Sequence, residues 1–223
     1  IGFSEYFALR VPGATEPGES TPLEVARYCA RMREQFGSTL FEGKVGVLDL
    51  DTEIQMVKEV RAAIGPDATL RLDANNSWPI NTARKALARL EPFNIANIED
   101  PAPTFFDMAK LRQHSAIPFS SHFPDLRMAA ELGVPDTFVL NVMALGGIRE
   151  TVKFISACEV LGVGFWFYSG ETAVGTAAYM QLAAAVPYLS QAGQSLLRWY
   201  AADVIAEPIQ PKALARWSGG VTS

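Results

Sequence analysis

The segment ATLRLDANNSWPINTARKALARLEPFNIANIE, residues 68–99, decides the fold of this chain. It begins with ATLRLD and ends with NIANIE, two short apolar runs that are typical of buried parallel strands. Residues 81–93 between them carry apolar side chains at helical spacing, so the segment is predicted to form a strand, a helix and a strand. Asp73 and Glu99 end the two strands, and in a parallel β/α barrel such ends form the face that holds functional sites.

The same alternation extends along most of the chain. Strands are predicted at residues 2–9, 38–46, 68–73, 94–99, 117–122, 136–142, 164–169 and 188–193. Helices are predicted at residues 22–36 with Thr21 as N-cap, at 51–65 between Asp51 and Gly65, and at 81–93, 125–133, 147–162 and 173–187. This α/β pattern predicts a TIM-type (β/α) barrel. An open doubly wound sheet is the alternative, although no Gly-rich phosphate loop follows the first strand.

Composition narrows the possible classes of protein. The 223 residues are 49% hydrophobic and 19% charged, which fits one globular domain of barrel size. The net charge of −5 makes nucleic acid an unexpected partner, and the chain has no apolar run of the ~20 residues that a membrane helix needs. Cys29 and Cys158 are interpreted as buried thiols within helices, which favours a reducing, cytoplasmic location.

Polar residues follow or end most of the predicted strands. Side chains two apart on a strand share a face, so we expect the following to converge on one barrel mouth: Glu42, Lys44, Arg71, Asp73, Asn75, Asn97, Glu99, His122, Asn141, Trp166 and Tyr168. Singly, the acids also fit helix N-caps and the histidine a hydrogen-bonded loop residue. Together, an acid pair with a lysine suits removal of a proton α to a carboxylate, with a divalent cation to stabilise the resulting charge.

Several stretches resemble the enolase superfamily, in its muconate-lactonising, mandelate-racemase and glucarate-dehydratase branches. They are FEGKVG, LRLDAN, IEDP, VLNVMALGGI and GETAVGTAAYMQLAAA. The resemblance implies a modified (β/α)7β barrel over residues 1–195 and a tail, 196–223, that would return to an α+β capping domain absent from this sequence. It also implies a small carboxylate substrate, a homo-oligomer and a bound Mg²⁺ ion, with the superfamily's use of a Lys or His base.

The resemblance also assigns roles to individual residues. The metal ligands would be Asp73, Glu99 and His122, the catalytic residues Lys44, Tyr168 and Asn141, and the substrate-binding residues Glu42, Asn75 and Glu171. Lys44 would be the base.

Four of these positions depart from the superfamily pattern. Glu42 stands where the family has the first lysine of its Lys-x-Lys pair, and its charge is expected to raise the pKa of Lys44. His122 replaces an acid or Asn, which favours Zn²⁺, Mn²⁺ or Fe²⁺ over Mg²⁺, unless Asp125 serves instead or the metal site is lost. Asn141 replaces a second base, and Tyr168 replaces a histidine and offers a phenol as general acid.

Two functions from different classes follow. The first is a divalent-metal-dependent lyase or isomerase, of the acid-sugar dehydratase or cycloisomerase kind, with Lys44 as its base. The alternative is a catalytically degenerate relative that keeps the barrel and acts as a binding or assembly protein. Exchange of the α-proton of a substrate with solvent separates the two, because only the enzyme catalyses it.

Overall fold

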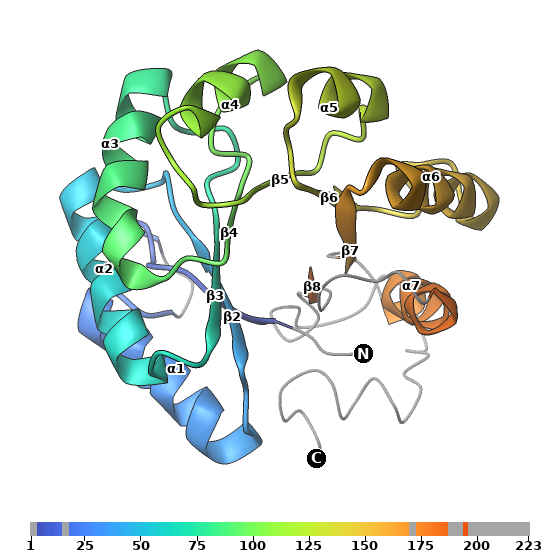
Figure 1. Cartoon of the computed structure of the whole chain (residues 1–223). Coiled ribbons are helices and arrows are strands. Elements are labelled where there is room, and N and C mark those ends of the chain that lie inside the picture. Colours follow the sequence, from blue (N-terminus) through green and yellow to red (C-terminus); the bar gives the residue numbers. More distant parts are fainter. Residues whose placement is uncertain (1–3, 15–17, 170–172, 187–193, 196–223) are drawn as a thin grey trace. The chain divides into compact units, whose positions relative to one another are not determined.

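The computed structural model describes residues 4–14, 18–169, 173–186 and 194–195. Within them strands and helices alternate in the order predicted for a (β/α)7β chain (Figure 1). The strands are β1 Glu5–Phe7, β2 Leu40–Lys44, β3 Thr69–Asp73, β4 Asn97–Glu99, β5 Phe119–Ser121, β6 Thr137–Leu140, β7 Gly164–Ser169 and β8 Gln194–Ser195. The helices are α1 Pro22–Phe36, α2 Leu50–Ile64, α3 Ile80–Leu90 with the 3₁₀ turn η1 Glu91–Phe93, α4 Phe105–Arg112, α5 Leu126–Leu132, α6 Ile148–Leu161 and α7 Ala173–Ala185.

The chain divides into two compact units, which are described separately. The first unit comprises Glu5–Ser121 and Arg127–Asp136, and the second comprises Ile1–Ser4, His122–Leu126 and Thr137–Ser223. In the first unit β1 to β5 are hydrogen bonded in sequence order, all in parallel. In Figure 1, α1, α2 and α3 run along the outer side of β2 and β3.

The two faces of the first unit's sheet differ in chemistry. Phe41, Leu70, Leu72 and Ile98 alternate with the polar residues and are fully buried, as the core of a β/α layer requires. The register aligns Tyr6, Glu42, Arg71 and Asn97 across four strands on the opposite face. One polar face and one apolar face therefore run through the same sheet.

Gly43 of β2 is needed because of a close approach. It lies opposite Phe7 of β1, and a Cβ atom at this position would overlap the buried Phe7 ring. Glycine within a strand often marks such a contact.

In the second unit, β6 pairs with β7 and β7 with β8, again in parallel. Its core contains the fully buried Phe138, Phe165, Trp166 and Phe167. Phe167 stacks on Tyr179 of α7 at a centroid distance of 5.8 Å.

The helix boundaries test the predicted caps. Thr21 caps α1 within a capping box completed by Glu24, and Gly65 ends α2, as predicted. The prediction of Asp51 as the first cap of α2 is wrong: Asp49 is the N-cap, and its carboxylate accepts hydrogen bonds from the backbone and hydroxyl of Thr52. Both residues are acids that precede apolar periodicity, and the turn geometry selects the earlier one.

Other sequence expectations fared differently. Cys29 and Cys158 are buried free thiols, as predicted. Residues 188–193, the predicted eighth strand, lie outside the described residues, as does the tail at 196–223, and β8 consists of the two residues that follow the predicted strand. Helix α4 was not predicted from the sequence.

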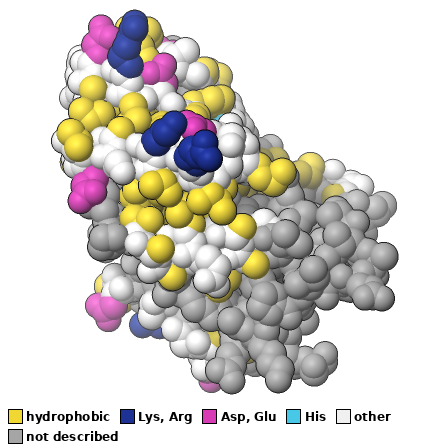
Figure 2. Space-filling model, turned by 90° about the vertical axis from the view of Figure 1, so that its right-hand side faces the viewer, with side chains coloured by type: hydrophobic (Ala, Val, Ile, Leu, Met, Phe, Trp, Pro, Cys, Tyr) yellow, Lys and Arg dark blue, Asp and Glu magenta, His cyan; other side chains and the backbone are white. Residues whose placement is uncertain are grey.

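Across the described part of the chain, every helix is too short or too polar to cross a bilayer. On the face shown in Figure 2, charged side chains of both signs lie among apolar ones.

Candidate active site

Lys44 and Asp73 form the centre of the candidate site. They are the last residues of β2 and β3 and lie opposite each other in the strand register. The Lys44 Nζ atom lies 2.7 Å from Asp73 Oδ2, and the two side chains are 26% and 8% exposed. The parallel register therefore brings the predicted base and the predicted first ligand together, with the Lys44 side chain partly exposed.

Asn75 holds the Asp73 carboxylate from the other side. Its backbone N–H donates to Asp73 Oδ1 at 2.9 Å, and its side-chain amide donates to Oδ1 and Oδ2 at 2.8 and 3.0 Å. The backbone of Asn75 is left-handed, with φ at 46°, a conformation that asparagine adopts more readily than most residues. In this structure the amide orients Asp73, and contact with a substrate stays a prediction.

Glu42 makes its ion pair with Arg71, its neighbour across the β2–β3 register. The Arg71 Nη2 and Glu42 Oε2 atoms lie 2.7 Å apart, and each side chain is 1% exposed. The expectation that Glu42 acts mainly on Lys44 did not include this guanidinium. A role for Glu42 in substrate binding stays a prediction.

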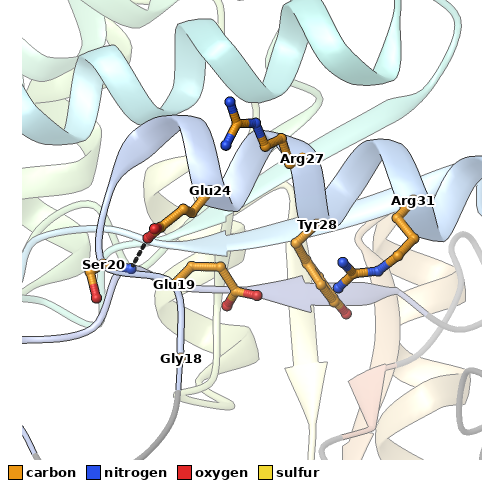
Figure 3. Close-up of a pocket in the computed structure, with 7 residues that line it drawn as sticks. All are labelled: Gly18, Glu19, Ser20, Glu24, Arg27, Tyr28 and Arg31. Atoms are coloured by element: carbon orange, nitrogen blue, oxygen red, sulfur yellow. Dashed lines mark hydrogen bonds between the residues drawn. The ribbon is translucent and has the colours of Figure 1, made fainter.

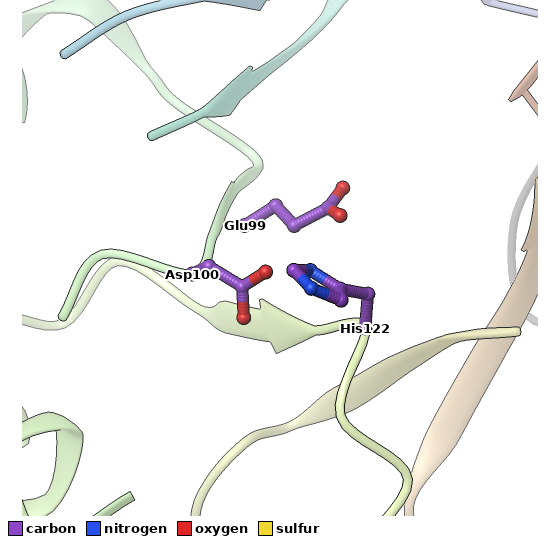
Figure 4. Close-up of side chains that lie close together, drawn as sticks. All are labelled: Glu99, Asp100 and His122. Atoms are coloured by element: carbon purple, nitrogen blue, oxygen red, sulfur yellow. The ribbon is translucent and has the colours of Figure 1, made fainter. Parts of the chain in front are cut away.

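Asp100 is a residue that the sequence analysis did not single out. Among the described residues, Glu99, Asp100 and His122 each offer a ligand atom within 4.8 Å of the others (Figure 4). Glu99 ends β4, and His122 directly follows β5. Strand alternation alone would turn Asp100 away from Glu99, but its left-handed φ of 44° breaks the alternation. The consecutive acids in IEDP were the available signal.

Tyr6 of β1 was also missed. It lies opposite Glu42 in the register, on the polar face of the sheet. Burial raises the pKa of its phenol, and negative charge on three carboxylates raises that pKa further: Asp73, Glu42 and Glu99. Tyr6 is therefore a neutral hydroxyl beside the site at physiological pH. Alternation along the first predicted strand could have suggested it.

The remaining predicted residues belong to the second unit or are not described. The Asn141 side-chain oxygen accepts from the backbone N–H groups of Met143 and Ala144 at 2.9 and 3.2 Å, so it closes the turn after β6. Tyr168 is half-buried on β7. The His122 ring lies 4.1 Å from the ring of Phe123, centroid to centroid. Glu171 lies outside the described residues.

The residues at the strand ends fit a divalent cation. The three acids Asp73, Glu99 and Asp100 are nearly or fully buried. Lys44 contributes one ammonium group, which pairs with Asp73. Buried carboxylates require compensating positive charge, and carboxylate oxygens are the ligands that Mg²⁺ and Mn²⁺ prefer. Asp125 is exposed and does not belong to this group.

A separate pocket of about 430 Å³ lies along α1 (Figure 3). Its lining contains none of the predicted site residues and consists of Gly18, Glu19, Ser20, Glu24, Arg27, Tyr28 and Arg31. Glu24 there accepts a hydrogen bond from the backbone of Ser20 at 2.7 Å, as part of the helix cap.

The family model described as "Enolase C-terminal domain-like" matches residues 24–215 of the chain. The chain belongs to the enolase superfamily. Both the family and its TIM-type barrel fold agree with the resemblance to the mandelate-racemase and muconate-lactonising branches that the sequence showed.

Two curated relatives and one solved structure illustrate this kinship. The o-succinylbenzoate synthase of Thermobifida fusca is 33% identical over 71% of this chain and 51% of its own length. The protein named "Probable glucarate dehydratase" of Streptomyces coelicolor is 30% identical over 83% of this chain and 44% of its own length. An enolase of Pseudomonas fluorescens Pf0-1, solved with bound magnesium, potassium and tartrate, has 25% identity and a TM-score of 0.80 over 94% of this chain and 53% of its own. The chain thus spans about half the length of the curated relatives it matches.

Proposed function

We propose that this superfamily member takes part in a divalent-metal-dependent lyase or isomerase reaction that removes a proton α to the carboxylate of a small acid. The observation that carries the proposal is the juxtaposition of Lys44 and Asp73 at the ends of paired strands, with Glu99 next in register. The names of the relatives, a synthase and a dehydratase, support this reaction class. The finer reaction that we propose is acid-sugar dehydration or cycloisomerisation.

Lys44 is the proposed base. Its side chain is a quarter exposed at the carboxyl end of β2, so it is accessible from solvent, while Asp73 fixes its direction. A positioned base of this kind contributes roughly 10²–10⁴-fold to a proton transfer.

Asp73 and Glu99 are the proposed metal ligands. A third ligand would come from Asp100 or His122, which lie within 4.8 Å of Glu99. The ion, when bound, supplies positive charge that offsets the charge developing on the substrate carboxylate. Mg²⁺ is supported by the magnesium in the P. fluorescens neighbour, and Mn²⁺ by the imidazole of His122.

A single base suits some reactions better than others. Asn141 cannot accept a proton, and its oxygen closes a turn, so two-base racemisation is disfavoured. One lysine can still serve a syn elimination or a cycloisomerisation, in which the same group removes and returns a proton, and Tyr168 is kept as a candidate general acid for a leaving hydroxyl. The small carboxylate substrate, a homo-oligomeric assembly and a cytoplasmic location complete the proposal and rest on the family resemblance and the two free thiols.

The test follows deuterium entering the α-position of carboxylic acids in D₂O by NMR, with Mg²⁺ or Mn²⁺ present. The acids include tartrate and glucarate. Lys44→Met should lower exchange at least about 100-fold. Lys110→Met is the matched control, because Lys110 also pairs with an aspartate, Asp107, but on the exposed surface of α4.

Exchange within about tenfold of wild type in Lys44→Met would remove Lys44 as the base. Absence of exchange in the wild-type protein with every acid would favour the degenerate binding protein instead.

A further inference from the structure

Four charged side chains form an alternating ladder on two paired strands. Glu42 and Lys44 share one face of β2, and Arg71 and Asp73 share the same face of β3. The register places Glu42 opposite Arg71 and Lys44 opposite Asp73. Both rungs of this charge ladder are ion pairs of 2.7 Å, with their polarity reversed from one rung to the next.

The two rungs differ in their access to solvent. The Glu42–Arg71 rung is 1% exposed on both sides, whereas Lys44 is 26% exposed. The Glu42–Arg71 rung is therefore shielded from solvent in this structure, and its effect on Lys44 passes through the side chains of the ladder. A buried ion pair contributes little net stability relative to an apolar pair of similar volume, so stability alone does not account for it.

We infer that Arg71 is a positioning residue that holds Lys44 on Asp73 by engaging Glu42. This inference rests on the proposed function of Lys44. A carboxylate with 1% exposure requires a cation close by. On the same face of β2 the next cation is Lys44, two residues along, whose flexible chain can turn toward Glu42. Arg71 satisfies Glu42 from β3, and the lysine then stays at the open end of its strand with Asp73.

The first test is independent of activity. The melting temperatures of Glu42→Gln, Lys44→Met and the variant with both changes are measured by thermal unfolding. The set is measured once with Arg71 present and once in the Arg71→Met background, to see whether the two changes in melting temperature add. With Arg71 present, the two melting-temperature changes should add to within about 2 °C. In Arg71→Met they should deviate from additivity by roughly 4 °C or more, because Lys44 then pairs with Glu42. Equal coupling in both backgrounds would overturn the inference.

The second test uses α-proton exchange. Arg71→Met should lower kcat by about tenfold or more with little change in KM, because the substrate does not touch this residue. Adding Glu42→Met should restore most of kcat, since no buried carboxylate then competes for Lys44; a role of Glu42 in substrate binding would change KM instead. Arg89→Met, which removes an exposed pair with Asp51, is the control and should change neither quantity.

The double variant also covers the case in which Arg71→Met does not fold. Glu42→Met with Arg71→Met replaces a buried ion pair by apolar side chains, a change that proteins tolerate well. A folded double variant without exchange would overturn the inference. If Arg71 acts only by keeping Glu42 from pairing with Lys44, activity must survive when Arg71 and Glu42 are both replaced. If wild-type protein shows no exchange, the proposed function fails. The unfolding experiment still decides whether Arg71 keeps Glu42 from pairing with Lys44.

Discussion

Gly43→Ala provides a sharp test of the packing beneath the candidate site. Gly43 lies between Glu42 and Lys44 on β2, and a Cβ atom added to it would overlap the Phe7 ring of the neighbouring strand. Phe7 is 1% exposed, so its ring is buried among the core side chains. A methyl group at residue 43 therefore forces either the ring or the backbone of β2 to shift.

The magnitude follows from this overlap. Inserting a methyl group into a tightly packed core costs about 1–3 kcal/mol. In a protein of about 150–250 residues, each kcal/mol moves the melting temperature by about 2–4 °C, so Gly43→Ala should lower it by roughly 2–12 °C. A shift of β2 also displaces Lys44, the next residue, and exchange activity should fall with stability.

The assay is thermal unfolding followed by circular dichroism. Gly18→Ala is the control, because a Cβ there would lie 3.8 Å from Arg10 Cβ, an ordinary contact, and its stability should change by at most about 1 kcal/mol. Phe7→Leu added to Gly43→Ala should recover part of the loss, since leucine leaves room for the methyl group. A Gly43→Ala variant as stable as wild type, or no relief from Phe7→Leu, would refute the reasoning.

Two further predictions concern the metal and a buried thiol. Adding Mg²⁺ or Mn²⁺ to metal-stripped protein at 100 times the dissociation constant should stabilise it by about 2.7 kcal/mol, or roughly 5–11 °C. Glu99→Gln should abolish the rise and the exposed Glu131→Gln should retain it; an unchanged rise in Glu99→Gln would exclude Glu99 as a ligand. Burial raises the pKa of the Cys158 thiol from 9.0 to about 12, so the folded state favours the neutral form. The resulting stability is present below pH 9 and lost as the pH rises toward 12, and Cys158→Ala should flatten this loss in urea titrations; an unchanged slope would contradict the assignment.

Much of the architecture could be predicted because its signals are local. Thr21 and Pro22 mark the start of α1, and the runs ending at Asp73 and Glu99 mark the ends of β3 and β4. Alternation along each strand then indicates which side chains share a face. The convergence of Lys44, Asp73 and Glu99 on one end of the sheet could be predicted from these features, whereas the ion pair between Lys44 and Asp73 was known only from the register.

Partners across strands could not be predicted in the same way. Glu42 was expected to act on Lys44, its neighbour along the strand, but the register gives it Arg71. Asp100 lies near Glu99 and His122 because its own left-handed backbone interrupts the strand alternation. Tyr6 lies opposite Glu42 because β1 pairs with β2. A single sequence does not reveal how far apart residues of different strands lie.

The sequence by itself determined the kind of element at most positions, the faces of the strands and the chemical groups available at their ends. Hydrophobic periodicity and capping residues act within a few residues, so they can be recognised without a structure. The tertiary structure alone decided which charge neutralises which, because ion pairing depends on register and burial. The four side chains of the charge ladder could be paired in more than one way, and hydrogen bonding between β2 and β3 selects the arrangement that keeps Lys44 at the open end.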